Sequence, residues 1–78
     1  MINETIYKNF KFTFGKTTWS IMTGGMYIVV IKTSQPKHMQ FGKTFNSFDS
    51  AQKHYNCPKL KTALLQVELG LVEPTEIL

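Results

Sequence analysis

Residues 17–32, with the sequence TTWSIMTGGMYIVVIK, decide the fold of this chain. Apolar and polar side chains alternate over residues 17–22, which is the period of a strand with one buried face. Residues 26–32 are apolar on both parities, as in a strand at the centre of a sheet. Gly24 and Gly25 lie between the two runs and suit a tight hairpin turn, because glycine readily adopts positive φ. The stretch therefore predicts two neighbouring antiparallel strands.

A third strand is predicted upstream, over residues 5–14, where apolar and polar residues again alternate. Gly15 and Lys16 supply a turn signal between this strand and the next. The three strands together form a meander. Three phenylalanines share one parity and are expected in the core: Phe10, Phe12 and Phe14.

The stretch after the central strand is polar and has no period. Residues 33–40 include a proline, and this is where a ligand-contacting loop is expected. Phe41, Lys43 and Phe45 then alternate weakly. Residues 41–45 therefore form either a short fourth strand or more of the loop.

The pattern changes period after residue 46, which predicts helices. Ser47 can cap a first helix at residues 48–55, and Pro58 suits the first position of a second helix at residues 58–69. Gly70 is expected to end the second helix as its C′ residue. The apolar stripe of the second helix comprises Leu60, Ala63, Leu64, Val67 and Leu71, and it is widened by Leu65 and Leu69.

Strands followed by helices predict an α+β fold, in which both helices pack on one face of an antiparallel sheet. At 78 residues the chain is expected to form one small domain, residues 1–78, which ends in a loose acidic tail at residues 72–78. A composition of 42% hydrophobic, 13% aromatic and 18% charged residues is that of a folded protein rather than a disordered one.

Cysteine usage and hydropathy point to the cytoplasm. The chain has one cysteine, Cys57, so it cannot form the internal disulfides on which small secreted domains depend. The first residues lack the basic and apolar regions of a secretory signal peptide. The longest aliphatic run, residues 28–31, is far too short to span a membrane. We therefore expect a cytoplasmic protein without a membrane partner.

Charge is distributed unevenly along the chain. All nine basic residues are lysines within residues 1–61, which also contain two acids, so this part carries +9 − 2 = +7. Residues 62–78 contain three glutamates, which brings the total to +7 − 3 = +4. A basic body fits a polyanion partner, whereas the absence of arginine argues against base-specific readout of guanine. Codon bias in an AT-rich genome also produces lysine-only usage, and both explanations stay open.

No motif predicts nucleotide binding. Gly-Lys-Thr occurs at residues 15–17 and again at residues 42–44. A phosphate-binding P-loop needs a further glycine five residues earlier, where Phe10 and Lys37 stand. We therefore expect no nucleotide and no other cofactor.

The histidines and the cysteine do not predict a metal site or an active site. His38, His54 and Cys57 are too few for a zinc site without another ligand. A nucleophilic Cys57 with His54 as its base is a remote alternative, and no third group that would orient the base is evident. We therefore expect no metal and no enzymatic activity.

Lysines interleaved with aromatic residues are the remaining functional signal. Basic surfaces whose aromatic rings stack on bases bind single-stranded nucleic acid. Tyr7 and Lys11 share one parity and would form a small platform together with Tyr27 or Trp19. In the alternative interpretation, the aromatics are core and the lysines only solvate the sheet and its edges. The candidate nucleic-acid-binding residues are Tyr7, Lys8, Lys11, Lys16, Lys32, Lys37 and Lys43.

Residues 41–55, FGKTFNSFDSAQKHY, follow three predicted strands and resemble the strand-to-helix junction of small DNA-binding modules of the AP2 and integrase-arm types. In those modules a step containing Gly and Phe, here Gly42 and Phe45, leads into a helix with Ala and Tyr, here Ala51 and Tyr55. The resemblance implies a sheet that enters the major groove of DNA. Those families read DNA with strand arginines, which this chain lacks, and here a second helix follows directly. The resemblance therefore concerns architecture.

Our leading hypothesis is a non-catalytic binding module that presents a lysine-bearing sheet face to nucleic acid, as in a small accessory protein of a bacterium or phage. The alternative is a protein-interaction or homodimerisation module. Such a module would use an exposed sheet edge or two leucines of the second helix, Leu65 and Leu69. These leucines make the apolar stripe of that helix wider than a narrow core contact requires. An enzyme that depends on Cys57 is the remote alternative.

Overall fold

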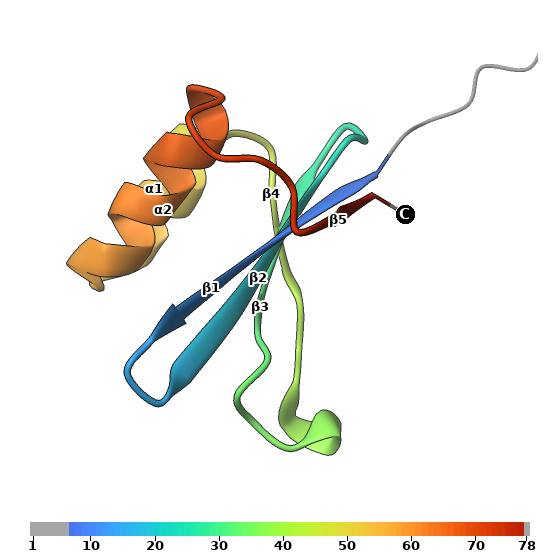
Figure 1. The fold of residues 1–78 in the computed structure, drawn as a ribbon, viewed down its shortest axis with the longest axis vertical. Helices are drawn as coiled ribbons and strands as arrows, with labels where there is room; N and C mark the ends of the chain where they lie inside the picture. The colour runs from blue at the N-terminus through green and yellow to red at the C-terminus, as the bar shows by residue number, and fades with distance from the viewer. Residues whose placement is uncertain (1–6, 78) are drawn as a thin grey trace, which may run out of the picture.

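Five strands and two helices make up the fold of residues 7–77, which the computed structural model describes (Figure 1). The helices are α1 (Phe48–His54) and α2 (Pro58–Glu68). One antiparallel sheet, ordered β4-β3-β2-β1-β5, carries both helices on one face, which confirms the predicted α+β fold. The strands and a short 3-10 helix are β1 (Lys8–Phe14), β2 (Thr17–Thr23), β3 (Ile28–Lys32), η1 (Lys37–Met39), β4 (Lys43–Phe45) and β5 (Glu76–Ile77).

The β1–β2–β3 meander forms where the alternating pattern predicts it, but two strands are shorter. β1 begins at Lys8, and residues 5–6 of the predicted strand lie outside the described part of the chain. β3 begins at Ile28 rather than at residue 26, because residues 24–27 form the turn. Gly24 has φ 119° in this turn, a conformation that glycine adopts without a steric penalty.

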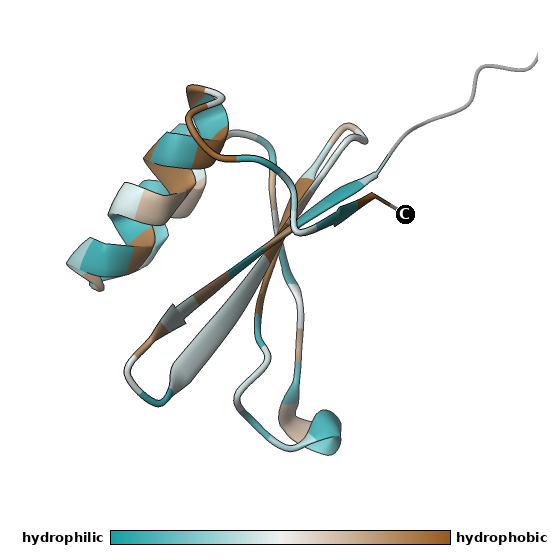
Figure 2. Ribbon diagram, viewed as in Figure 1, coloured by the Kyte–Doolittle hydropathy of each residue, from teal (hydrophilic) through white to brown (hydrophobic). Residues whose placement is uncertain are grey.

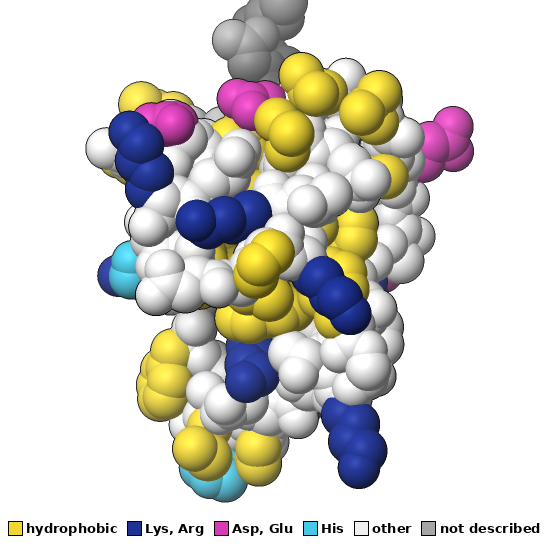
Figure 3. Space-filling view, turned by 90° about the vertical axis from the view of Figure 1, so that its left-hand side faces the viewer, with side chains coloured by type: hydrophobic (Ala, Val, Ile, Leu, Met, Phe, Trp, Pro, Cys, Tyr) yellow, Lys and Arg dark blue, Asp and Glu magenta, His cyan; other side chains and the backbone are white. Residues whose placement is uncertain are grey.

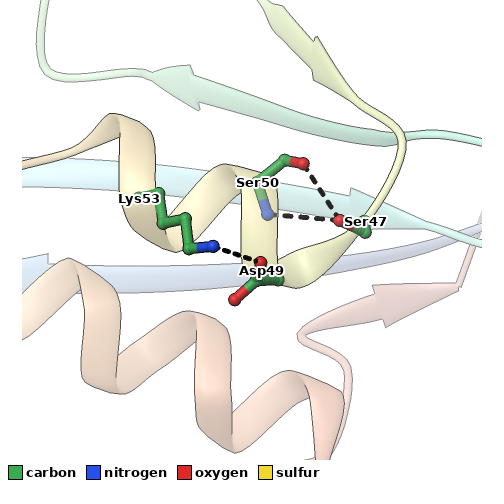
Figure 4. A network of polar contacts seen from close by, with 4 residues as sticks. All are labelled: Ser47, Asp49, Ser50 and Lys53. Carbon is green, nitrogen blue, oxygen red and sulfur yellow. Dashed lines mark hydrogen bonds and ion pairs between the residues drawn. The ribbon is translucent and has the colours of Figure 1, made fainter.

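The predicted helices and the fourth strand are confirmed. Residues 43–45 form β4, which decides between the two interpretations of residues 41–45. Both helices end one residue earlier than predicted. The N–H of Ser50 donates to Oγ of Ser47 at 3.1 Å, so Ser47 caps α1 as expected (Figure 4). One turn later, Lys53 forms an ion pair with Asp49 at 3.0 Å, also drawn in Figure 4.

α2 ends in a turn that depends on Gly70. Gly70 has φ 70°, and its N–H donates to the carbonyl of Val67 at 3.2 Å. The N–H of Leu71 donates to the carbonyl of Gln66 at 2.9 Å. These two bonds make a Schellman motif, so the prediction that Gly70 is the C′ residue is confirmed. Neither helix of the described residues is long and apolar enough to cross a membrane.

The C-terminal segment differs from its prediction. Where the sequence predicts a loose tail at residues 72–78, the short strand β5 forms beside the start of β1. The N–H of Thr75 donates to the carbonyl of Asn9 at 2.7 Å, and the N–H of Lys11 donates to Oγ1 of Thr75 at 2.9 Å. A two-residue strand held by backbone bonds has no periodic pattern, so hydrophobic periodicity could not predict it. Leu78 lies outside the described residues.

The core lies between the sheet and the helices. Figure 2 shows hydrophobic residues along the middle of the strands and on part of α2. Phe10 is buried as predicted, whereas Phe12 and Phe14 are half-buried and pack at the rim of the core, towards the β1–β2 turn. The buried core residues are Phe10, Ile21, Ile28, Val30, Phe45, Ala51, Leu60, Ala63, Leu64 and Val67.

Cross-strand pairing assigns each strand residue to one of two faces. Phe10 pairs with Ile21, and Ile21 pairs with Val30; all three are buried against the helices. The neighbouring row, which contains Lys11 and Ser20, faces the other way because successive strand residues point to opposite faces. No described helix covers this second face (Figure 1).

Candidate nucleic-acid interface

The acidic side chains of the described residues gather at one end of the molecule. Asp49 lies at the start of α1, Glu68 ends α2, Glu73 follows α2, and Glu76 is in β5. Because α1 and α2 run in opposite directions, the start of α1 lies beside the end of α2, in the upper part of Figure 1. Figure 3, which views the helix-covered side, shows the acidic side chains in its upper part. We call this end the acidic end.

Three of the candidate lysines lie at the opposite end, where turns and loops join the strands, and Lys43 lies closer to the middle of the sheet, opposite Val30 in β3. Figure 3 shows lysines extending over the middle and lower parts of the surface, with no acidic side chain in the lower part of that view. The chain has no acidic residue between Glu4 and Asp49, so none of the described segments at this end carries a negative side chain. The electrostatic potential here is therefore positive. We call these four residues the basic end: Lys16 in the β1–β2 turn, Lys32 ending β3, Lys37 in η1 and Lys43 starting β4.

The loop between β3 and β4 is held in one conformation by its own hydrogen bonds. The side-chain amide of Gln40 donates to the carbonyls of Thr33 at 3.1 Å and Gln35 at 2.6 Å. The N–H of Thr33 donates to the carbonyl of Thr18 at 2.8 Å, which ties the loop to β2. The loop predicted to contact a ligand therefore presents Lys37 from an organised backbone. This order reduces the conformational entropy that the loop would lose on binding.

An exposed aromatic side chain lies beside the basic end. Phe41, between the loop and β4, is 79% exposed, and Met39 in η1 is also exposed. The sequence candidates do not include Phe41, because its weak alternation with Lys43 and Phe45 made it look like a strand residue. The signal that could have found it is its place directly after a polar, non-periodic loop. A ring this exposed has a face that is free to stack on a flat partner group.

Two lysines of the basic end lie over aromatic rings. Nζ of Lys32 is 5.9 Å from the centre of the Trp19 ring, and Nζ of Lys43 is 6.0 Å from that of Phe45. These cation–π contacts restrict each ammonium group to the surface next to its ring. Trp19 is half-buried, with Tyr55 packed edge-on at 5.5 Å, so this ring belongs to the rim of the core.

The remaining sequence candidates lie elsewhere, so the seven do not form one patch. Lys8 lies next to β5, near the acidic end. The Tyr7 ring lies against Gly25 in the β2–β3 turn, where a Cβ on the glycine would come within 3.3 Å of it. Lys11 points away from the helices, whereas Trp19 points towards them, so these two cannot share the predicted platform.

The surroundings of Cys57 and His54 are those of a packed junction. Cys57 is the N-cap residue of α2 and is half-buried against the core. The His54 ring packs against Phe45 at 5.5 Å and Tyr55 at 4.8 Å, and burial raises the pKa of the Tyr55 phenol. Residues 7–77 enclose no pocket and contain no group of three side chains placed to hold a metal ion.

Comparisons with protein-family models, curated proteins and solved structures found no match to this chain. Residues 41–55 contain β4 and α1, and α2 and β5 follow them.

Proposed function

We propose that the protein is a non-enzymatic module that binds single-stranded nucleic acid through the basic end. The observation that carries this proposal is the set of four lysines, free of acidic neighbours in sequence, beside the exposed ring of Phe41. Such a partner and the free thiol of Cys57 both fit a reducing, cytoplasmic setting.

The chemistry of these residues favours an unpaired strand. Lysine ammonium groups neutralise phosphates without selecting a base, and an exposed ring can stack on any base whose face is free. In a duplex the base faces are already stacked, so Phe41 would have no partner there. The proposal therefore predicts little sequence preference and a preference for single strands over duplexes.

Salt dependence tests the electrostatic part of this proposal. Four phosphate contacts to a single strand give a slope of about −3 in a plot of log affinity against log salt. The dissociation constant for a 12-nucleotide oligo-dT should therefore rise by about 50-fold between 50 and 200 mM salt. Fluorescence anisotropy of labelled oligo-dT measures both values. Absence of binding at 50 mM salt, or binding that ignores salt, contradicts the proposal.

Phe41→Ala tests the stacking part. Losing one base–aromatic stack is expected to weaken oligo-dT binding by about fivefold to tenfold, while stability is unchanged because the ring is 79% exposed. Met26→Ala is the matched control, since Met26 is 86% exposed in the β2–β3 turn, away from the basic end. Equal oligo-dT affinity of Phe41→Ala and the wild type at the same salt concentration would show that Phe41 is not part of the interface.

A further inference from the structure

α2 presents a line of exposed residues on the side opposite the core. Its buried residues face the sheet, whereas Thr62, Leu65 and Leu69 are exposed, the two leucines by 42% and 60%. These three positions are spaced three and four residues apart, so they lie along one line of the helix, as in a coiled-coil seam. We call Thr62, Leu65 and Leu69 the α2 stripe. Two exposed leucines on adjacent turns of one helix form an apolar surface that a partner could cover.

We propose that a second copy of this chain covers the α2 stripe, with the two α2 helices packed antiparallel about Leu65. The two copies would then bury the same leucines against each other across a two-fold axis. Such an isologous contact is the commonest form of self-association. This inference does not depend on nucleic-acid binding, because the α2 stripe contains none of the four lysines of the basic end.

The charges beside the α2 stripe select a second copy and its direction. Lys61 and Glu68 are seven residues apart, or two helical turns, so they border the stripe on the same side. In an antiparallel pair centred on Leu65, Lys61 of each copy lies next to Glu68 of the other. In a parallel pair, the basic first turns of both helices, with Lys59 and Lys61, would lie together and repel.

The charge distribution of the whole molecule points the same way. α2 begins with Lys59 and Lys61 and ends at Glu68 in the acidic end, so an antiparallel pair places the lysines of one copy beside the acids of the other. The contact is small, because an 11-residue helix is only about 16 Å long. We therefore expect a weak dimer with a dissociation constant of about 10 to 100 µM.

Analytical ultracentrifugation of the full chain from 5 µM to 1 mM tests the association. The wild type is expected to shift from a 9.0 kDa monomer towards a mass of twice that value. Leu65→Lys is expected to stay monomeric throughout, while its circular dichroism spectrum and oligo-dT affinity match those of the wild type at 5 µM. A wild type that stays monomeric at 1 mM, or that forms larger assemblies without a dimer, overturns the inference.

Charge reversal tests the antiparallel arrangement. Lys61→Glu and Glu68→Lys are each expected to weaken the dimer by about tenfold, because each places like charges together at two symmetric positions. The double variant carrying both reversals restores both pairs and should associate within about threefold of the wild type. A double variant as weak as the single ones overturns the antiparallel arrangement.

Discussion

Leu64→Ala is expected to lower the free energy of unfolding by about 3 kcal/mol. Leu64 has no exposed surface and lies on the face of α2 that packs against the sheet. Shortening it leaves a cavity whose walls cannot collapse fully, so the loss exceeds the transfer free energy of the missing atoms. Chains of this size have small margins of stability, and much of the variant should be unfolded well below the melting temperature of the wild type.

The adjacent residue supplies a matched control. Leu65→Ala makes the same chemical change one position along the same helix, but Leu65 is 42% exposed and faces away from the core. Its expected cost is below about 1 kcal/mol. Urea unfolding at 5 µM protein, where most chains are monomeric, measures both values. Similar losses for the two variants would mean that the described orientation of α2 is wrong.

This contrast between neighbours shows what periodicity could predict. The helical spacing placed Leu60, Ala63, Leu64 and Val67 on one stripe, and all four are buried. Leu71 belongs to the same stripe by spacing, but it is exposed because Gly70 reverses the chain before it. Periodicity describes a regular helix, so it fails at the first residue beyond a turn.

The sheet shows the same limit. Alternation predicted β1, β2 and β3, because each runs long enough for a period of two to appear. The two residues of β5 are too few for any period, and their pairing with β1 depends on where the chain returns after α2. That return is a property of the whole fold, which local patterns do not contain.

The candidate site was predictable only in part. Residue type identified the lysines, and parity assigned the strand residues to faces. Neither could tell which lysines meet at one end of the molecule. Lys8 and Lys16 flank the same strand, yet Lys8 lies beside the acidic β5 and Lys16 lies at the basic end. Their separation follows from strand direction and from a strand that no pattern predicts.

Charge variants can therefore test whether binding depends on the position of the lysines or only on their number. The triple variant Lys16→Gln, Lys32→Gln and Lys37→Gln removes three phosphate contacts of the basic end. We expect oligo-dT affinity at 50 mM salt to fall at least about 30-fold and the salt slope to become shallower by about 2. None of the three lysines belongs to the buried core, so the fold should be retained.

A second triple variant, Lys8→Gln, Lys11→Gln and Lys59→Gln, has the same net charge of +4 − 3 = +1 but leaves the basic end intact. Because long-range attraction depends on net charge and is screened within about 10 Å at 0.1 M salt, its affinity should fall by less than about threefold, with the salt slope unchanged. Fluorescence anisotropy over the same salt series measures both variants. If the two lose affinity equally, the lysines act only through net charge, and the basic end is not a binding site. If only the second variant loses affinity, the interface lies on the open sheet face around Lys11 rather than at the loops.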